Sequence, residues 1–445
     1  MLGRMCVPML VALLLSANAL QAQAGPVPAA VTLPRATEDS AVAQWFRANA
    51  IPLATVRPAS GSADLEPLRH IVGDAKLVLL GEATHGTREF FELKHRFIEY
   101  LASSAGFTRL ITEGEWSGMR DAAAVLTSPS GRPDSALMAL RRWNLTATPA
   151  TALLAWVQRY NREAGGERLA IDGMDMQDPW RSAERLLAYL RIVDSSAASD
   201  LATAIRPLEG RARNFELVSA YSRLDSAVLA RVRNGIDRAR SRLLTEQVAY
   251  ISRSSAYSWE DAVHEALVLH QGATLYATKG WPQGAGAMRD RFLAENVFAI
   301  AARTNGRAIL WAHNAHVMRS QWAGRETLGG HLSRVLGSEM VVFGFAFNRG
   351  EFRAREPGSG AVATHAVGPA PEGSISAMLA RVGLPLFMID LRKAPKSGPV
   401  AEWPNRAHPE RSVGGEYRAD AELPAVSPGA AYDVLVFIDT TTWSN

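Results

Sequence analysis

The chain has 445 residues, of which 47% are hydrophobic and 21% charged, with 48 basic against 44 acidic side chains and one cysteine. This composition excludes a disordered chain and a disulfide scaffold, and a mean hydropathy of -0.05 argues against a protein with many membrane spans. The net charge of +4 is small for this length, and without a concentrated basic patch nucleic acid is not an expected partner.

The first 24 residues have the features of a secretory signal peptide. The apolar run over 7–15 is too short to span a bilayer, and Ala-Gln-Ala at 22–24 fits a cleavage pattern of small residues. We expect cleavage before Gly25 and a periplasmic or secreted mature protein with no membrane association; an uncleaved N-terminal anchor is the alternative. Because Cys6 lies in this segment, the mature protein would contain no cysteine and could not be a thiol enzyme.

Residues 25–60 are rich in Pro, Ala and Ser and are expected to form a leader segment before one α/β domain over 61–445. In this domain, short β-branched runs alternate with long helical stretches, which predicts a three-layer α/β/α fold with a mostly parallel sheet. Several runs are apolar throughout, as expected of strands covered on both faces. The expected strands are Lys76–Leu80, Arg109–Thr112, Arg168–Ile171, Ala308–Ala312, Met340–Phe347, Leu384–Ile389 and Asp433–Ile438.

Two stretches depart from this alternation. About 180–271 shows helical spacing and many arginines but no convincing strand, and it is too long for a single crossover. We therefore expect a large helical insertion there. The stretch 393–428 contains six prolines, so no regular structure is expected before the last strand.

Acidic and histidine side chains follow the carboxyl ends of four expected strands, where open parallel sheets bind their ligands. They are Glu82 and His85, then Glu113 and Glu115, then Asp175, and finally His313, Asn314 and His316. A single such residue is more often a helix cap or a satisfied core group, but four strand ends together indicate acid–base chemistry. The motifs of α/β-hydrolase serine enzymes, P-loop proteins and HExxH zinc enzymes are absent from the sequence.

Four motifs resemble the erythromycin esterase family. They are GEATHGTREF at 81–90, FTRLITEGEW at 107–116, GMDMQ at 173–177 and WAHNAHV at 311–317. The resemblance covers about 65 to 440 and implies a three-layer α/β fold with a helical insertion, and hydrolysis of the lactone ester of macrolide antibiotics. Because known members include cytoplasmic antibiotic-resistance enzymes, a secretory leader is a departure. Many relatives have no assigned substrate, so the resemblance fixes the fold better than the ester.

His85 is the expected general base, because its pKa lies near neutral pH and because it matches the general base of the family. Either Glu82 or Glu113 is expected to orient its ring. His313 and His316 are expected to donate to a developing oxyanion, or to bind a metal together with His85 and a glutamate. The family is usually read as metal-independent, so we expect no metal and no cofactor.

A further set of residues is expected to hold the substrate. Arg88, Lys94, Arg289 and Arg291 are cation candidates, with structural ion pairs as the alternative. The other expected residues are Glu115, Trp116, Trp143, Asp175 and Asn314. Asp175 is expected to organise the site rather than to act as a catalyst. The two tryptophans are expected to form walls of the cleft, although a tryptophan is more often a residue of the hydrophobic core.

The sequence thus predicts a hydrolase that cleaves a small-molecule carboxylic ester, of macrolide lactone type, by direct attack of a His85-activated water. The alternatives are a metal-dependent hydrolase of another ester or amide, and a non-catalytic periplasmic binding protein. The oligomeric state is not predicted.

Overall fold

The computed structural model describes residues 35–140, 148–164, 168–208, 225–278, 283–303 and 306–443. The expected signal peptide, the first ten residues of the leader segment (25–34), and Trp143 lie outside the described residues.

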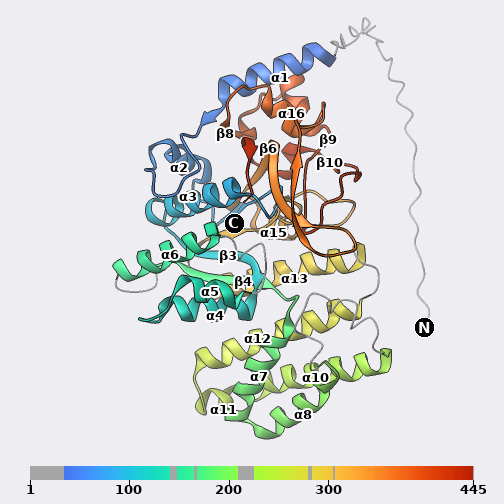
Figure 1. Cartoon of the computed structure of the whole chain (residues 1–445). Coiled ribbons are helices and arrows are strands. Elements are labelled where there is room, and N and C mark those ends of the chain that lie inside the picture. Colours follow the sequence, from blue (N-terminus) through green and yellow to red (C-terminus); the bar gives the residue numbers. More distant parts are fainter. Residues whose placement is uncertain are drawn as a thin grey trace, which may run out of the picture.

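A nine-stranded sheet forms the centre of the molecule (Figure 1), in the order β1-β8-β11-β6-β2-β5-β3-β4, with β7 paired to β6. Neighbours from β11 to β4 pair in parallel, whereas β1, β7 and β8 pair antiparallel. The strands are β1 (Ile51–Pro52), β2 (Leu77–Leu80), β3 (Phe107–Glu115), β4 (Ala170–Asp175), β5 (Arg307–Trp311), β6 (Met340–Arg355), β7 (Val362–Val367), β8 (Leu386–Asp390) and β11 (Val434–Thr441). The mostly parallel α/β fold expected from the sequence is confirmed.

All seven expected strands are present, but some ends differ. The strands β3 and β4 run on through Glu115 and Asp175, so these acids lie on the last strand residues and not in loops beyond them. Two strands were not expected: β1 is only two residues long, and β7 pairs with the outer half of β6, at Gly350 to Arg355.

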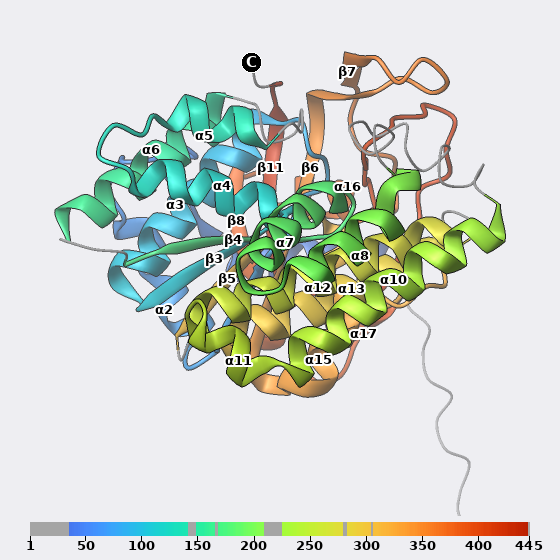
Figure 2. The ribbon, with the colours of Figure 1, turned by 90° about the horizontal axis from the view of Figure 1, so that it is seen from below.

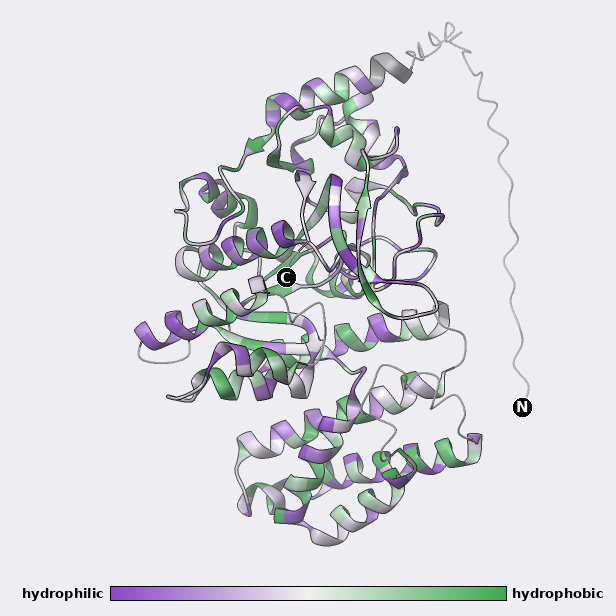
Figure 3. Cartoon of the chain, in the orientation of Figure 1, coloured by the Kyte–Doolittle hydropathy of each residue, from purple (hydrophilic) through white to green (hydrophobic). Residues whose placement is uncertain are grey.

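Helices cover both faces of the sheet because successive strand residues point to opposite sides. In β2, Val78 and Leu80 join one buried cluster, while Leu77 and Leu79 join the other. The first cluster packs under α2 (Pro67–Val72), α3 (Arg88–Ser104), α4 (Trp116–Thr127), α5 (Pro133–Ala139) and α6 (Thr148–Glu163). The second packs under α1 (Arg35–Asn49), α13 (Gln283–Ala302), α15 (Leu328–Leu336) and α16 (Ile375–Ala380). Figure 3 shows the strands as largely hydrophobic and many helices as amphipathic, with one hydrophobic and one hydrophilic face.

A helical unit with a core of its own lies at one end of the molecule (Figure 1), and in the view from that end its helices lie in front of the sheet (Figure 2). It consists of α7 (Pro179–Val193), α8 (Ser195–Ile205), α10 (Ser226–Thr245), α11 (Gln247–Ser252) and α12 (Ala256–Ala277). Buried polar contacts tie it to the sheet domain: the Ser117 hydroxyl donates to Glu265 at 2.6 Å and also contacts Ser182 at 2.7 Å. These helices occupy the region where the insertion was expected.

The proline-rich stretch 393–428 is more ordered than expected. It contains α17 (Pro399–Glu402) and a pair of two-residue strands, β9 (His408–Pro409) and β10 (Ala425–Val426), before α18 (Pro428–Ala431). The expectation of no regular structure is wrong in this respect, because elements this short leave no periodic pattern in a sequence. No helix within the described ranges has both the length and the apolar character that a membrane crossing requires.

Candidate active site

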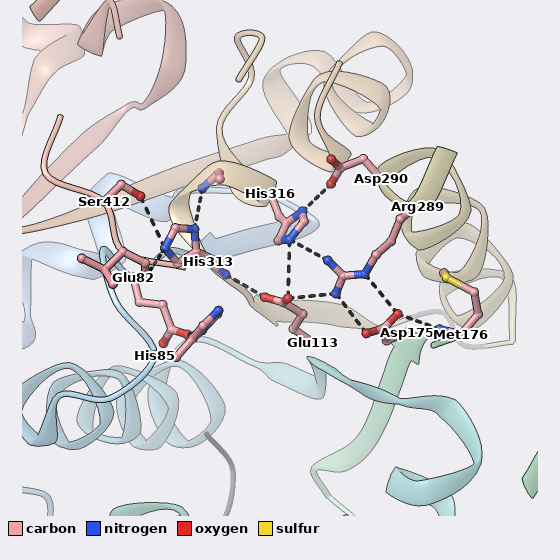
Figure 4. Close-up of polar contacts among 12 residues, drawn as sticks. Glu82, His85, Glu113, Asp175, Met176, Arg289, Asp290, His313, His316 and Ser412 are labelled. Carbon is pink, nitrogen blue, oxygen red and sulfur yellow. Dashed lines mark hydrogen bonds and ion pairs between the residues drawn. The ribbon is translucent and has the colours of Figure 1, made fainter. Parts of the chain in front are cut away.

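The polar residues at the carboxyl ends of β2, β5, β3 and β4 meet at one edge of the sheet, because these four strands are neighbours in the sheet and parallel. Figure 4 shows Glu82, His85, Glu113, His313 and His316 around one centre. The predicted convergence of acids and histidines therefore exists in the structure.

Two glycines let the loop after β2 lie close to its neighbours. A side chain at Gly81 would overlap the amide oxygen of Asn314, and one at Gly86 would overlap the backbone of Arg353. The Arg353 amide donates to the Gly86 carbonyl at 3.1 Å, and Asn314 N donates to the Glu82 carbonyl at 2.8 Å. The loop that carries His85 is thus fixed between β5 and β6.

Glu82 is the carboxylate that holds the His85 ring. Its Oε1 lies 2.7 Å from His85 Nδ1, and both side chains are buried. A carboxylate at this distance accepts the Nδ1 proton, so the neutral ring carries its lone pair on Nε2. Of the two glutamates expected to orient this histidine, the geometry selects Glu82.

Glu82 is in turn held ionised by Lys94 and Trp311. Lys94 Nζ is completely buried, pairs with Glu82 Oε2, and lies 3.8 Å from the centre of the Trp311 ring. Trp311 Nε1 donates to the same oxygen at 2.9 Å. Burial would raise the pKa of Glu82, but the charge of Lys94 and the hydrogen bond from His85 outweigh it and lower the pKa to about 2. Burial also lowers the pKa of Lys94, to about 8, against the opposing effect of Glu82.

The surroundings favour the protonated form of His85. Burial alone would lower its pKa, but the hydrogen bond and the charge of Glu82, helped by the charge of Glu113, raise the pKa above its usual value. A histidine with these neighbours can take up a proton and keep the resulting cation stable, as a general base requires.

Arg289 joins the other two carboxylates of the site. Its guanidinium donates to Asp175 Oδ2 and to Glu113 Oε1, both at 2.9 Å. Burial raises the pKa of Glu113, but the charge and the hydrogen bond of Arg289 outweigh it, so that the pKa lies well below its usual value. Glu113 Oε2 also accepts from the backbone amide of His313 at 3.0 Å. Glu113 therefore links the ends of β3 and β5 through a paired, mostly buried charge.

His316 has defined partners on both ring nitrogens. Arg289 can only donate, so His316 Nε2, 2.8 Å from Nη1, accepts. On the other side of the ring, Nδ1 faces the Asp290 carboxylate and donates its proton to it. Asp290 was not among the expected site residues, although it stands beside Arg289 in the sequence.

His313 is neutral and fixed. Its Nδ1 accepts from the amide of Ala315 at 3.1 Å, which leaves the proton on Nε2 to be donated to the Val413 carbonyl at 3.1 Å. Burial, with the charge of His85, lowers the pKa of His313 to about 3. The imidazole rings of His85 and His313 are tilted by 53° to each other, with ring centres 5.0 Å apart.

Asn314 links the loop after β5 to two other segments of the chain by hydrogen bonds. Its amide group donates to the Phe345 carbonyl and to Glu410 Oε1, each at 2.8 Å. Glu410 also accepts from the Tyr432 hydroxyl at 3.0 Å, and burial raises its pKa to about 7. No sequence pattern pointed to Glu410, because its partners Asn314 and Tyr432 are 96 and 22 positions away along the chain.

The hydrogen bonds bear on the metal-ligand alternative. In the part of the chain that the structure describes, no three His, Cys, Asp or Glu side chains are arranged to hold a metal. His313 and His316 each use both ring nitrogens for protein contacts. A metal at the proposed His85, His313 and His316 set would require these bonds to break.

Several expected substrate-binding residues lie elsewhere. Lys94 is wholly buried under Glu82, so it supports the site from inside. Trp116 is also buried, stacked on His264 with ring centres 3.7 Å apart, so it does not form a cleft wall. Arg291 is exposed and paired with Glu295 at 3.5 Å, away from the centre. Arg88 is exposed and paired with Glu92 at 2.7 Å.

Glu115 is half-buried and stands opposite Asp175 in the β3–β4 register. Asp175 is fully buried and forms an ion pair with Arg289 at 2.9 Å. Trp143 lies outside the described residues.

Comparison with known proteins gives one family. Residues 102–441 match the family model for erythromycin esterase. The chain is 22% identical to erythromycin esterase type II of Escherichia coli over 338 residues, which is 71% of this chain and 79% of that protein.

Solved structures share the fold. A protein of Bacillus cereus is similar with a TM-score of 0.81 and 25% identity, over 91% of this chain and 98% of that one. A protein described as a succinoglycan biosynthesis protein has a TM-score of 0.79 at 22% identity, over 92% and 98%. A mutant of erythromycin esterase EreC in its open conformation has a TM-score of 0.70 at 16% identity, over 89% and 98%.

Proposed function

Since the chain belongs to the erythromycin esterase family, we propose that it is a hydrolase that cleaves the carboxylic ester of a macrolide-type lactone with water activated by His85. The Glu82–His85 pair at the end of β2 is the observation that carries this proposal, because it combines a fixed tautomer with a raised pKa.

The reaction follows from the protonation states in the site. His85 Nε2 takes a proton from a water molecule as that water attacks the ester carbonyl, and Glu82 and Glu113 stabilise the imidazolium that forms. The imidazolium then returns the proton to the departing alkoxide. The mature chain would contain no cysteine, and the sequence has no serine nucleophile motif, so water attacks directly and no acyl-enzyme forms.

His313 and His316 have supporting roles in this scheme. In each of them both ring nitrogens are engaged by protein contacts, so neither ring offers a lone pair that competes with His85 for the proton. We propose that His313 and His316 shape the wall opposite His85.

We also propose that the protein acts in the periplasm or outside the cell after removal of residues 1–24.

A panel of macrolactones and linear esters, read by mass spectrometry for the gain of one water, tests the proposal. His85→Ala should lower turnover by at least ~100-fold, the usual scale for losing a general base. His70→Ala, a change at an exposed histidine of α2, is the matched control and should leave turnover unchanged.

The proposal fails if no member of the panel is hydrolysed, or if His85→Ala remains as active as the control. An acylated protein trapped by rapid quenching would contradict direct attack by water. Loss of activity on chelation, restored by one divalent ion, would favour the metal-dependent alternative.

A further inference from the structure

The site contains a second carboxylate–histidine pair, whose carboxylate has no role in the reaction proposed above. Asp290 belongs to α13, and its Oδ1 pairs with His316 Nδ1, as Glu82 pairs with His85 after β2 (Figure 4). Asp290 is completely buried, and the side chain of His316 is 11% exposed. A buried carboxylate on one ring nitrogen of a histidine fixes the tautomer of that ring.

The tautomer of His316 decides how Arg289 is held. With the ring proton on Nδ1, His316 Nε2 accepts a hydrogen bond from Arg289 Nη1 at 2.8 Å. The rest of the guanidinium faces acids: Nε lies 3.3 Å from Asp175 Oδ1, and Nη2 donates to Asp175 Oδ2 and Glu113 Oε1, each at 2.9 Å. With the ring proton on Nε2, two donors would face each other inside the protein, and Arg289 would have to turn away from one of its partners.

Arg289 in turn holds the carboxylate that acts on the general base. Its guanidinium is the cation that pairs with Glu113. Burial lowers the pKa of His85, and the charge of Glu113 is among the influences that oppose this. Glu113 Oε2 also accepts from the backbone amide of His313, whose ring centre lies 5.0 Å from that of His85. A change of tautomer at His316 therefore reaches the general base through Arg289 and Glu113.

Asp290 is held on its other side by Arg325. Arg325 Nε lies 3.5 Å from Asp290 Oδ2, which is an ion pair rather than a hydrogen bond. Arg325 ends a two-residue turn, in which it exchanges backbone hydrogen bonds with Trp322 at 2.9 and 3.0 Å. Ala323 in this turn has a φ of +49°, a strained conformation that persists only where the surrounding structure requires it. Gly286 leaves room for the guanidinium, because a side chain there would lie 2.9 Å from Arg325 Nη1.

We infer that Asp290 is a positioning residue of the proposed reaction, which keeps the proton of His316 on Nδ1 and is itself held by Arg325. The inference rests on the proposed function, because ester turnover is one of its readouts. Since the carboxylate of Asp290 is completely buried, it acts on the reaction only through the residues that it contacts. Its effect on turnover should therefore disappear when the His316 ring is absent.

Asp290→Asn provides the catalytic test, because the asparagine amide can donate to His316 Nδ1 and so move the ring proton to Nε2. We expect kcat to fall at least ~10-fold with a smaller change in KM. The loss should stay below the ~10⁴-fold cost of altering the carboxylate partner of a catalytic base, because His316 takes up no proton in the proposed reaction.

Asp237→Asn is the matched control. Asp237 also contacts the Nδ1 of a histidine, that of His270 at 2.6 Å, but this pair is partly exposed and lies in the helical unit. The control should leave kcat unchanged. A folded Asp290→Asn protein with the kcat of this control would overturn the inference.

A double-mutant cycle separates positioning from structural support. In a His316→Ala background, Asp290→Asn should lower kcat no further, because the ring through which Asp290 acts is gone. An equal fold-loss in kcat in both backgrounds would overturn the positioning role. Arg325→Met, a change at a partly exposed residue, tests the same network if Asp290→Asn does not fold. It should reproduce part of the kcat loss, and an unchanged kcat would contradict the part assigned to Arg325.

NMR of protein with ¹⁵N-labelled histidine reads the tautomer without catalysis. The His316 signals, assigned by their absence in His316→Ala, should show the proton on Nδ1 in the wild type and on Nε2 in Asp290→Asn.

The two proposals fail in different ways. A wild-type His316 with its proton on Nε2, or one whose tautomer is the same in Asp290→Asn, would overturn the positioning role and leave the esterase function intact. The expected tautomers in a protein that hydrolyses no member of the ester panel would refute the esterase function and keep the role of Asp290 in fixing the His316 ring.

Discussion

Replacing Lys94 with Met tests whether this lysine keeps Glu82 ionised beneath His85. Methionine preserves most of the apolar stem against Trp311 but removes the only charge that contacts Glu82 Oε2 in the described structure. Because both side chains are almost fully buried, the substitution removes the lysine counter-charge and leaves the carboxylate with only the titratable His85 ring as an ionic partner, at a cost of about 3–5 kcal/mol at pH 7. Part of this cost disappears if Glu82 takes up a proton.

The pH dependence gives this prediction its specific signature. In the wild type, the pKa of Glu82 is lowered to about 2, so its contribution to stability is present above pH 4.5 and is lost as the pH falls toward 2. In Lys94→Met, burial dominates and raises the pKa of Glu82, so the folded variant gains stability as the pH falls from 7. The difference in unfolding free energy between the two proteins should therefore narrow on acidification.

Urea denaturation of both proteins at pH 7.5 and pH 5.0 measures this difference. Lys94→Arg, which keeps a cation, is the matched control and should lose less stability than Lys94→Met. Turnover of Lys94→Met should also fall, because a protonated Glu82 no longer stabilises the His85 cation. A stability loss below ~1 kcal/mol at pH 7.5, or one independent of pH, would refute the reasoning.

Three further predictions concern Glu82, Glu410 and the leader segment. Glu82→Gln should move the acidic limb of the pH–kcat/KM profile to lower pH, because the pKa of His85 is raised mainly by that carboxylate against the effect of burial; an unmoved limb would contradict the pairing. Glu410→Gln should gain stability relative to wild type between pH 5 and 8 in thermal unfolding, since burial raises the pKa of Glu410 to about 7 and the wild type loses stability as the pH rises through that window. N-terminal sequencing of protein recovered from the periplasm should start at or near Gly25, and intact Met1 in soluble cytoplasm would refute the leader assignment.

The sequence by itself determined the layered fold and the edge at which the site lies. Runs such as Leu77–Leu80 are apolar at every position, which predicts a strand covered on both faces, and polar residues that follow parallel strands must meet at one edge. The Glu82–His85 contact was also within reach of sequence reasoning, because the two residues are only three apart in one short loop.

Only the tertiary structure decided which charges meet and which side chains face inward. Glu113 pairs with Arg289, which is 176 positions away, and His313 donates to Val413, 100 positions away. Lys94 and Arg88 both lie on α3, yet one is fully buried under Glu82 and the other is exposed. Periodicity predicts that a helix has a buried face, but the partner of each buried charge is set by packing between distant segments, and that packing fixes the protonation states on which the proposed chemistry depends.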